Sequence, residues 1–153
     1  MSYQKLEQHQ QQLHRLSHLS AICGWDQAAM MPEGGNEARA EAMAELGVLI
    51  HGKRTAPELG DWIARAESEP LDAIQRANLA EIKRHWQDAS LLPGELVEAL
   101  SLAGSKCEHA WRRQRKENDW AGFAPNLEEV VRLSREVATL RAEALGVRPY
   151  DAM

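Results

Sequence analysis

Apolar residues recur every three to four positions along nearly the whole 153-residue chain. No stretch shows the strict apolar and polar alternation that a half-buried β-strand requires. The pattern therefore predicts an all-α protein. It indicates a single helical domain over residues 1–153, with about six helices stacked as antiparallel hairpins, because helices joined by short loops pack beside each other.

Glycine and proline set the expected helix boundaries in the first third of the chain. A first helix is expected over about residues 3–23, with Gly24 ending or bending it. An irregular connection should follow, because Pro32 lacks a backbone donor and the neighbouring glycines tolerate positive φ. Asn36 is then expected to cap a second helix that Gly52 can close.

The middle of the chain has three further boundary signals. Residues 55–58, Thr-Ala-Pro-Glu, read as a capping box that starts a third helix. Pro70 is expected to start a fourth helix that runs to about Ala89. Pro93 and the glycine after it should break the chain before a fifth helix over about residues 95–118.

The last two helices share a spacing of alternating four and three residues, which is typical of helices that pack closely side by side. Asn126 and Glu129 form the expected capping box of the final helix, and Gly146 should end it. We expect an antiparallel hairpin with a crossing angle near about 20°. The seam positions are Leu96, Leu100, Ala103, Cys107 and Ala110, facing Val130, Leu133, Val137, Leu140 and Ala144.

Composition and charge narrow the function classes. The chain is 44% hydrophobic and 27% charged, which is ordinary for a soluble globular protein, and no apolar stretch is long enough to span a bilayer. Its net charge of -5 argues against nucleic-acid binding. One run, residues 106–119, carries excess positive charge, interpreted as a solvated face with phosphate binding as the alternative. A polar N-terminus and only two cysteines favour a cytoplasmic location.

Two arrangements that include histidine are candidates for metal binding or for acid–base catalysis. His14 and His18 have the spacing of a helical metal pair, but Arg15 stands where a zinc hydrolase carries glutamate, so surface histidines are the preferred interpretation. Glu81 and His85 can form a pair tuned for acid–base work. Their spacing of four is also that of a routine helix-stabilising pair, which we prefer.

The cysteines and tryptophans are interpreted as residues that pack in the fold. Cys107 lies on the predicted seam and Cys23 on the apolar face of the first helix, where thiols are unreactive packing groups. The tryptophans are spread singly over separate helices, which favours core anchors over a stacking surface. They are Trp25, Trp62, Trp86, Trp111 and Trp120.

One segment stands out: residues 25–39, Trp-Asp-Gln-Ala-Ala-Met-Met-Pro-Glu-Gly-Gly-Asn-Glu-Ala-Arg. Within it, Asp26 is expected to accept backbone N–H bonds at a helix end or to pair with Arg39; a role lining a substrate groove is the alternative. The segment resembles the opening signature of the carboxypeptidase Taq family. The resemblance continues at residues 56–60, 92–97, 117–120, 123–125 and 149–152, and covers almost the whole chain.

The resemblance implies a zinc (or cobalt) metallocarboxypeptidase that removes C-terminal residues from peptides with broad specificity. In that family the metal is held by a His-Glu-x-x-His helix downstream of the matched region, and this chain contains no such motif. No catalytic or metal residue maps onto it, so we expect no cofactor in this chain and no activity from it alone. The signature residues, with roles unassigned, are Trp25, Asp26, Met31, Pro32, Gly35 and Arg39.

The resemblance also implies that this region forms a wall or lid of the peptide-binding cleft, as the N-terminal part of a larger helical fold. The alternatives are a truncated, non-catalytic module for interaction or dimerisation and, less favoured, a nucleic-acid-binding helical protein. Several helices carry more apolar positions than one stripe uses, such as Leu19 beside Leu16 and Val131 beside Val130. We therefore expect self-association, as a homodimer or otherwise.

Overall fold

The computed structural model describes the backbone of residues 1–153 and the side chains of residues 1–32 and 34–153, and the regular structure that it describes is helical, without a strand. The all-α prediction is therefore confirmed, as is the expected number of long helices. The elements are α1 (Ser2–Ala29), η1 (Glu33–Gly35), α2 (Asn36–Arg54), α3 (Glu58–Ala66), α4 (Ala73–Ser90), α5 (Gly94–Glu117), α6 (Trp120–Leu145) and η2 (Pro149–Ala152).

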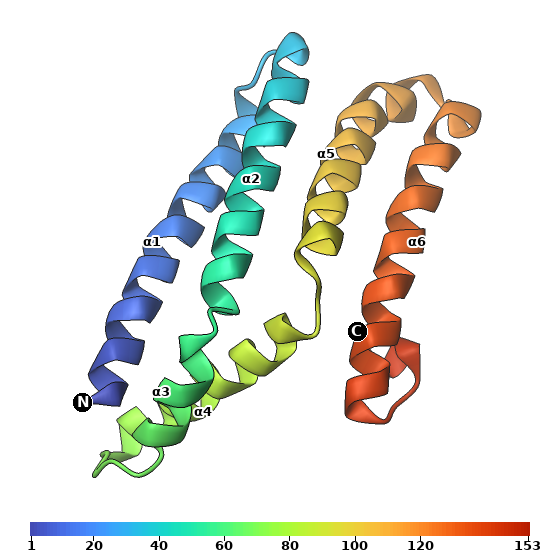
Figure 1. Ribbon diagram of the computed structural model, residues 1–153. Helices are drawn as coiled ribbons and strands as arrows, with labels where there is room; N and C mark the ends of the chain where they lie inside the picture. Colours follow the sequence, from blue (N-terminus) through green and yellow to red (C-terminus); the bar gives the residue numbers. More distant parts are fainter.

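Two antiparallel helical hairpins dominate the molecule (Figure 1). α1 and α2 form the first hairpin and α5 and α6 the second, while the shorter α3 and α4 lie at the open end of the first hairpin, near the N-terminus. α2 packs along α5 and so joins the two hairpins. The stacked hairpins expected from the sequence are thus present. Within the described ranges, no helix is long and apolar enough to cross a membrane.

The first core cluster holds α3 between α1 and α4. Leu6 and Leu59 are almost completely buried, at 0% and 1% exposure. Full burial of each leucine side chain is worth about 1.5–3 kcal/mol, so these contacts fix the short α3, which is too short to be stable alone. The buried members are Tyr3, Leu6, Leu59, Ile63, Ala66 and Leu79.

The second core cluster is the seam between α5 and α6. Leu96 on α5 packs with Leu133 and Val137 on α6, and all three are buried. Half-buried residues predicted for the same seam, including Leu100 and Leu140, pack against them. The predicted seam is therefore confirmed in its central part, because a heptad-like spacing keeps one apolar stripe facing its partner helix. Its predicted last position, Ala144, is wrong, since that residue is exposed near the end of α6.

Three boundaries predicted for the first hairpin are wrong. Gly24 lies inside α1, which continues to Ala29, and Gly52 lies inside α2, which continues to Arg54. An interior glycine costs a helix only about 1 kcal/mol, so packing between α1 and α2 overrides it. Asn36 makes no capping bond; it is the first residue of α2 and its side chain turns toward other helices.

The capping boxes were also misplaced. Thr55 does not cap α3: its hydroxyl donates back to the carbonyl of His51 at 3.0 Å and closes α2 instead. α4 starts after Pro70, at a capping box that the sequence interpretation missed. There, the carboxylate of Asp72 accepts from the N–H of Gln75 at 2.9 Å, and the Gln75 side chain accepts in return at 3.1 Å.

α6 begins six residues before the predicted cap at Asn126. Asn118 takes the left-handed conformation (φ 54°), which ends α5, and the carboxylate of Asp119 then caps α6 by accepting from the N–H of Gly122 at 2.9 Å. Pro125 consequently lies inside α6. Near the helix start it removes only one backbone hydrogen bond, so the helix runs through it.

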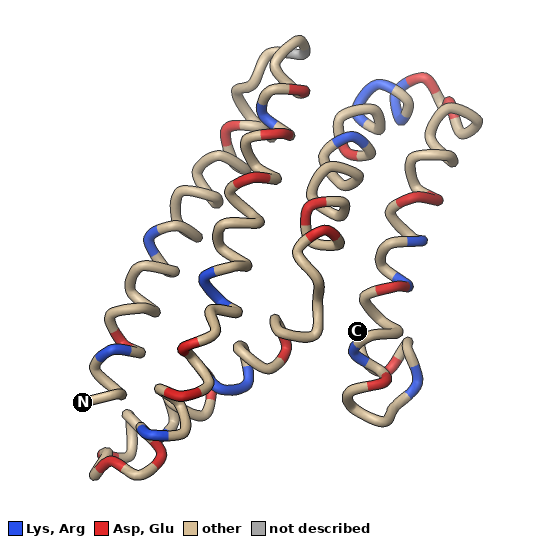
Figure 2. The backbone as a smooth tube through the Cα atoms, in the orientation of Figure 1, with Lys and Arg blue, Asp and Glu red and all other residues tan. Residues whose placement is uncertain are grey.

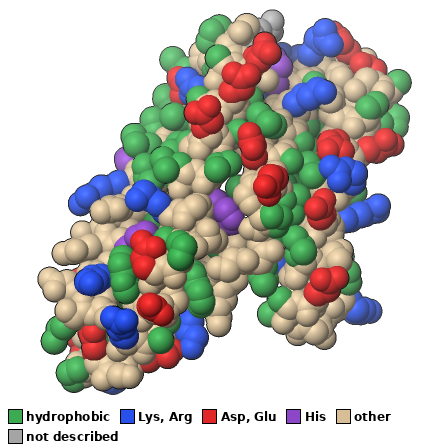
Figure 3. All heavy atoms as spheres, in the orientation of Figure 1, with side chains coloured by type: hydrophobic (Ala, Val, Ile, Leu, Met, Phe, Trp, Pro, Cys, Tyr) green, Lys and Arg blue, Asp and Glu red, His purple; other side chains and the backbone are tan. Residues whose placement is uncertain are grey.

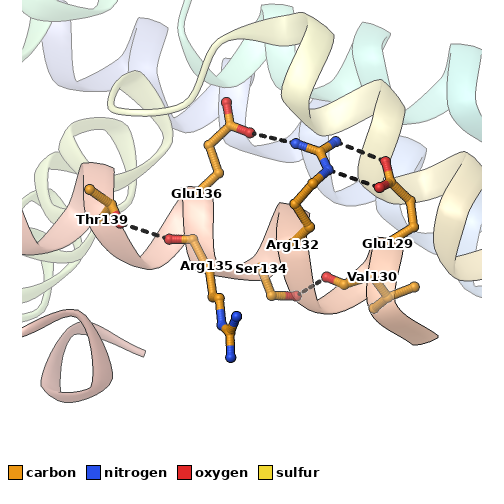
Figure 4. Close-up of polar contacts among 7 residues, drawn as sticks. All are labelled: Glu129, Val130, Arg132, Ser134, Arg135, Glu136 and Thr139. Atoms are coloured by element: carbon orange, nitrogen blue, oxygen red, sulfur yellow. Dashed lines mark hydrogen bonds and ion pairs between the residues drawn. The ribbon is translucent and has the colours of Figure 1, made fainter. Parts of the chain in front are cut away.

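The exposed face of α6 carries a short chain of ion pairs (Figure 4). The guanidinium of Arg132 donates two 2.8 Å bonds to the carboxylate of Glu129 and approaches Glu136 at 3.5 Å. These hydrogen bonds lower the pKa of Glu129 below its ordinary value of 4.5. Both partners are about half exposed, so the pairs mark this face as solvated more than they stabilise it.

The tryptophans divide into two groups. Trp62 and Trp86 pack against the first core cluster, as predicted. Trp25, Trp111 and Trp120 are 63%, 43% and 66% exposed, so their interpretation as core anchors is wrong. Figure 3 shows hydrophobic side chains reaching the surface over much of the visible face. Helical periodicity cannot separate an apolar side chain that is buried from one that is exposed within this chain.

Candidate functional site

The signature segment forms the turn between α1 and α2. Two of its residues lie in the last part of α1, two in the link, one at the end of η1 and one in the first turn of α2. The structure thus brings residues from two helices to one end of the first hairpin. In chain order they are Trp25, Asp26, Met31, Pro32, Gly35 and Arg39.

Asp26 and Arg39 form an ion pair across the turn. Oδ2 of Asp26 lies 2.7 Å from Nη1 of Arg39, and the same nitrogen donates to the carbonyl of Cys23 at 3.1 Å. The backbone carbonyl of Asp26 accepts from the N–H groups of Met30 and Met31, each at 2.8 Å. The predicted pairing is therefore confirmed, and it ties the end of α1 to the start of α2.

Close packing explains why a glycine stands at Gly35. A Cβ atom there would lie 3.1 Å from Cγ of Met31, a distance that would force the methionine side chain to shift. The Gly35 N–H also donates to the carbonyl of Pro32 at 2.9 Å, which closes the turn. The link is therefore compact, with Met31 folded back over Gly35.

A polar network joins this turn to α5. The side-chain amide of Gln27 donates to the hydroxyl of Ser105 at 2.8 Å and lies 3.4 Å from the side-chain oxygen of Asn36. Arg112 donates to the backbone carbonyl of Gln27 at 3.0 Å. Sequence reasoning missed the contacts with Ser105 and Arg112, because they join residues 78 and 85 positions apart that meet only when the first hairpin packs on α5.

Two arginines of the basic run on α5 form ion pairs with glutamates one helical turn away. Arg112 also binds the carboxylate of Glu108 at 2.8 Å, and Arg113 lies 3.9 Å from Glu117. Figure 2 shows this end of α5 with positive and negative residues interspersed. Both pairs are of the i,i+4 type that lines solvated helices. The arrangement therefore agrees with the preferred interpretation of a solvated face.

The remaining candidate groups do not assemble a reaction centre. Glu81 lies 2.7 Å from Arg84 but 3.8 Å from His85. The hydrogen bond from Arg84 lowers the pKa of Glu81. All three side chains are exposed, so the interpretation as a surface pair is confirmed. Cys23 and Cys107 are both free, and burial raises the pKa of the Cys107 thiol, which makes it less reactive.

The described residues contain no cluster of metal-binding side chains. Across residues 1–32 and 34–153, no three His, Cys, Asp or Glu side chains come together in a way that could hold one. His14 and His18 are exposed on α1 without a third ligand. A structural or catalytic zinc site needs three or four protein ligands, so the residues described do not fit a metal centre.

Apolar surface is the other prominent feature near the turn. Leu19, Ile22 and Trp25 on α1, and Met30 just after its end, are 49% to 66% exposed. We call them the α1 apolar strip. Their angular positions, at about 100° per residue, place them on one side of the helix. Exposed apolar side chains gathered on one side of a helix are typical of a surface that another segment or another protein covers.

Comparison with known proteins identifies that larger class. This chain belongs to the carboxypeptidase Taq (M32) metallopeptidase family, whose model matches residues 5–153. The resemblance noted in the sequence is therefore confirmed over nearly its full extent. The members of this family are metallopeptidases, while the residues described here offer no metal site.

Individual relatives are much longer than this chain. It is 36% identical to thermostable carboxypeptidase 1 of Thermus thermophilus over 152 residues, which covers 97% of this chain and 29% of that protein. The structure is similar to metallocarboxypeptidase 1 of Trypanosoma cruzi (TM-score 0.78, 40% identity, covering 99% of this chain and 30% of the other). It is also similar to the carboxypeptidase of Pyrococcus furiosus (TM-score 0.76, 25% identity, 99% and 30%). The chain is thus similar to one part of a larger helical fold.

Proposed function

We propose that this chain is the N-terminal helical region of a broad-specificity zinc carboxypeptidase, where it forms a wall or lid of the cleft that binds peptide substrates. The observation that carries the proposal is the extent of the match: nearly all of this chain corresponds to about 30% of proteins named as carboxypeptidases. In this proposal the rest of the longer protein supplies the zinc, its ligands and the glutamate base. The isolated chain is then inactive.

The physical arrangement supports a positioning role. The ion pair between Asp26 and Arg39 ties α1 to α2, and the bond from Gln27 to Ser105 ties the end of this hairpin to α5. A wall of a cleft must keep its shape while substrate binds, and side chains held on packed helices do this better than loops. The contribution of this chain would be to enclose the peptide, orient it and exclude water, without touching the hydrolytic step.

Self-association is a second proposal, carried by the α1 apolar strip. Exposed apolar patches of several hundred Å² are uncommon on soluble monomers and are usually covered by a partner. If nothing else covers the strip, we expect a second copy of the chain to do so, most simply across a two-fold axis. A non-catalytic interaction module would use the same strip. The free thiols accord with the reducing cytoplasm that we propose as its location.

A chimera tests the catalytic proposal. The 153 residues replace the matching 29% of the Thermus thermophilus carboxypeptidase, and release of C-terminal residues from N-acylated dipeptides is measured with added zinc or cobalt. We expect chelator-sensitive hydrolysis by the chimera and none by the isolated chain. Hydrolysis by the isolated chain would refute the proposal, as would a chimera that is folded and metal-loaded yet inactive.

A cleft variant sharpens the test. In the chimera, Asp26→Asn removes the charge that binds Arg39 while keeping the side-chain shape, and Glu37→Gln changes an exposed acidic residue in the first turn of α2 as a matched control. We expect Asp26→Asn to raise KM more than it lowers kcat, because a looser wall weakens substrate binding more than the chemical step. Equal kinetics for both variants would contradict a wall at this turn.

A further inference from the structure

A hollow of about 220 Å³ opens where α1, α2, α3 and α4 converge. Its polar lining comes from Gln10, His14 and Ser17 on α1, Arg54 at the end of α2, and His85 on α4. Each of these five side chains can donate a hydrogen bond, although Nε2 of His85 already accepts one from Arg84 at 2.8 Å, and none of the lining residues is acidic. His14 and His85, which the sequence gave no reason to connect, therefore line the same hollow.

The charge of this hollow favours an anion. Arg54 is permanently charged, and within the described part of the chain it forms no salt bridge. The acidic residue one turn from His85 is Glu81, and Arg84 already holds it at 2.7 Å. Arg54 is therefore left without a carboxylate partner, and a guanidinium binds carboxylates with strong, charge-assisted hydrogen bonds.

The floor of the hollow is apolar and well supported. Leu59 is 1% exposed, and Ile82 and Trp86 pack against the first core cluster. The indole of Trp86 lies against Gly60, where an added Cβ would come within 3.2 Å of it, so the ring has little room to move toward α3. A ligand that fits must combine a negative group with an apolar body, because the hollow has both kinds of surface.

We propose that this hollow binds a small carboxylate with an apolar body, with the carboxylate on Arg54 and His14 and the apolar part over Trp86. A peptide that ends in an apolar residue and a free apolar amino acid both offer this chemistry. The free amino acid also carries an ammonium group, for which the lining has no acidic partner. The acylated form should therefore bind more tightly. This binding does not require that the proposed peptidase function be correct.

Three probes test the ligand chemistry on the 153-residue protein, followed by ¹⁵N NMR. N-acetyl-leucine represents a peptide C-terminus, leucine the free amino acid, and N-acetyl-leucinamide the same body without the negative charge. We expect N-acetyl-leucine to shift the indole N–H signal of Trp86, leucine to bind several-fold more weakly, and the amide to bind at least about tenfold more weakly, since a charge-assisted bond is lost. Equal binding of acid and amide would overturn the proposal, as would tighter binding of leucine.

Variants then locate the site. Arg54→Gln should weaken N-acetyl-leucine binding about tenfold. Arg65→Gln, an exposed arginine on α3 outside the hollow, should leave it unchanged. Both side chains are exposed, so neither change should disturb folding, and His14→Asn gives an independent check on α1 with a smaller loss. Unchanged affinity in Arg54→Gln would refute the assignment, and so would shifts centred on the basic run of α5.

Discussion

Leu133 lies at the centre of the seam between α5 and α6 and is only 3% exposed. Leu133→Ala removes three carbon atoms from a site where Leu96 and Val137 pack against them. At about 0.8 kcal/mol for each buried methylene-sized group, the transfer loss is about 2.4 kcal/mol, and the cavity left behind brings the expected range to about 2–5 kcal/mol. We expect about 3 kcal/mol, because two helices joined by one short turn can close only part of the gap.

The assay is urea unfolding followed by circular dichroism. Val131→Ala is the matched control, since Val131 lies two residues earlier on α6 and is 37% exposed. For a chain of this size, a loss of about 3 kcal/mol in the free energy of unfolding corresponds to a fall of roughly 6–12 °C in melting temperature, which a thermal melt would show. The control should change the free energy of unfolding by less than about 1 kcal/mol. If the two variants unfold at the same urea concentration, the seam does not carry the packing energy argued here.

Four further outcomes are expected. Leu100→Asp should destabilise the protein severely, because an unpaired carboxylate then faces the same seam; a circular dichroism melt that matches the parent would contradict this. A double-mutant cycle between Asp26→Asn and Arg39→Gln, measured by urea unfolding, should give a coupling no larger than about 1 kcal/mol, since the side chains are 35% and 29% exposed. NMR titration should place the midpoint of Glu129 below 4.5, and Arg132→Gln should return it upward. Because the folded pKa is the lower one, this pair stabilises the fold above pH 4.5, and the contribution is lost as pH falls through the folded value. Light scattering over a concentration series should show self-association, and a strictly monomeric chain would count against it.

The sequence predicted the helices better than their ends. Helical periodicity located the seam around Leu133, because an apolar stripe that repeats over several turns can hardly be arranged in another way. The caps depended on local competition that the pattern does not show. Thr55 turned back to close α2, Asp72 capped α4 where no cap was predicted, and Asp119 took the capping role predicted for Asn126. Several short polar residues near each boundary can cap equally well, and packing selects among them.

The signature turn shows the same limit for a functional site. The pair between Asp26 and Arg39 could be predicted, because the two residues lie 13 positions apart across one turn. The bond from Gln27 to Ser105 could not, since it depends on how the two hairpins pack together. The hollow beside Arg54 is a similar case. His14 lies on α1 and His85 on α4, and they line the same hollow only because four helices converge there.

Uncovered apolar side chains lie on particular faces of this chain. The α1 apolar strip continues directly into the turn that holds Asp26, so whatever covers the strip must also lie beside the signature segment. One face of α6, with Arg132 between two carboxylates, is solvated (Figure 4), while Trp120, Val131 and Leu145 expose apolar surface elsewhere on the same helix. In the proposed function, a catalytic body that covers the α1 apolar strip would also lie beside the signature turn, and the proposal puts the peptide cleft at that edge.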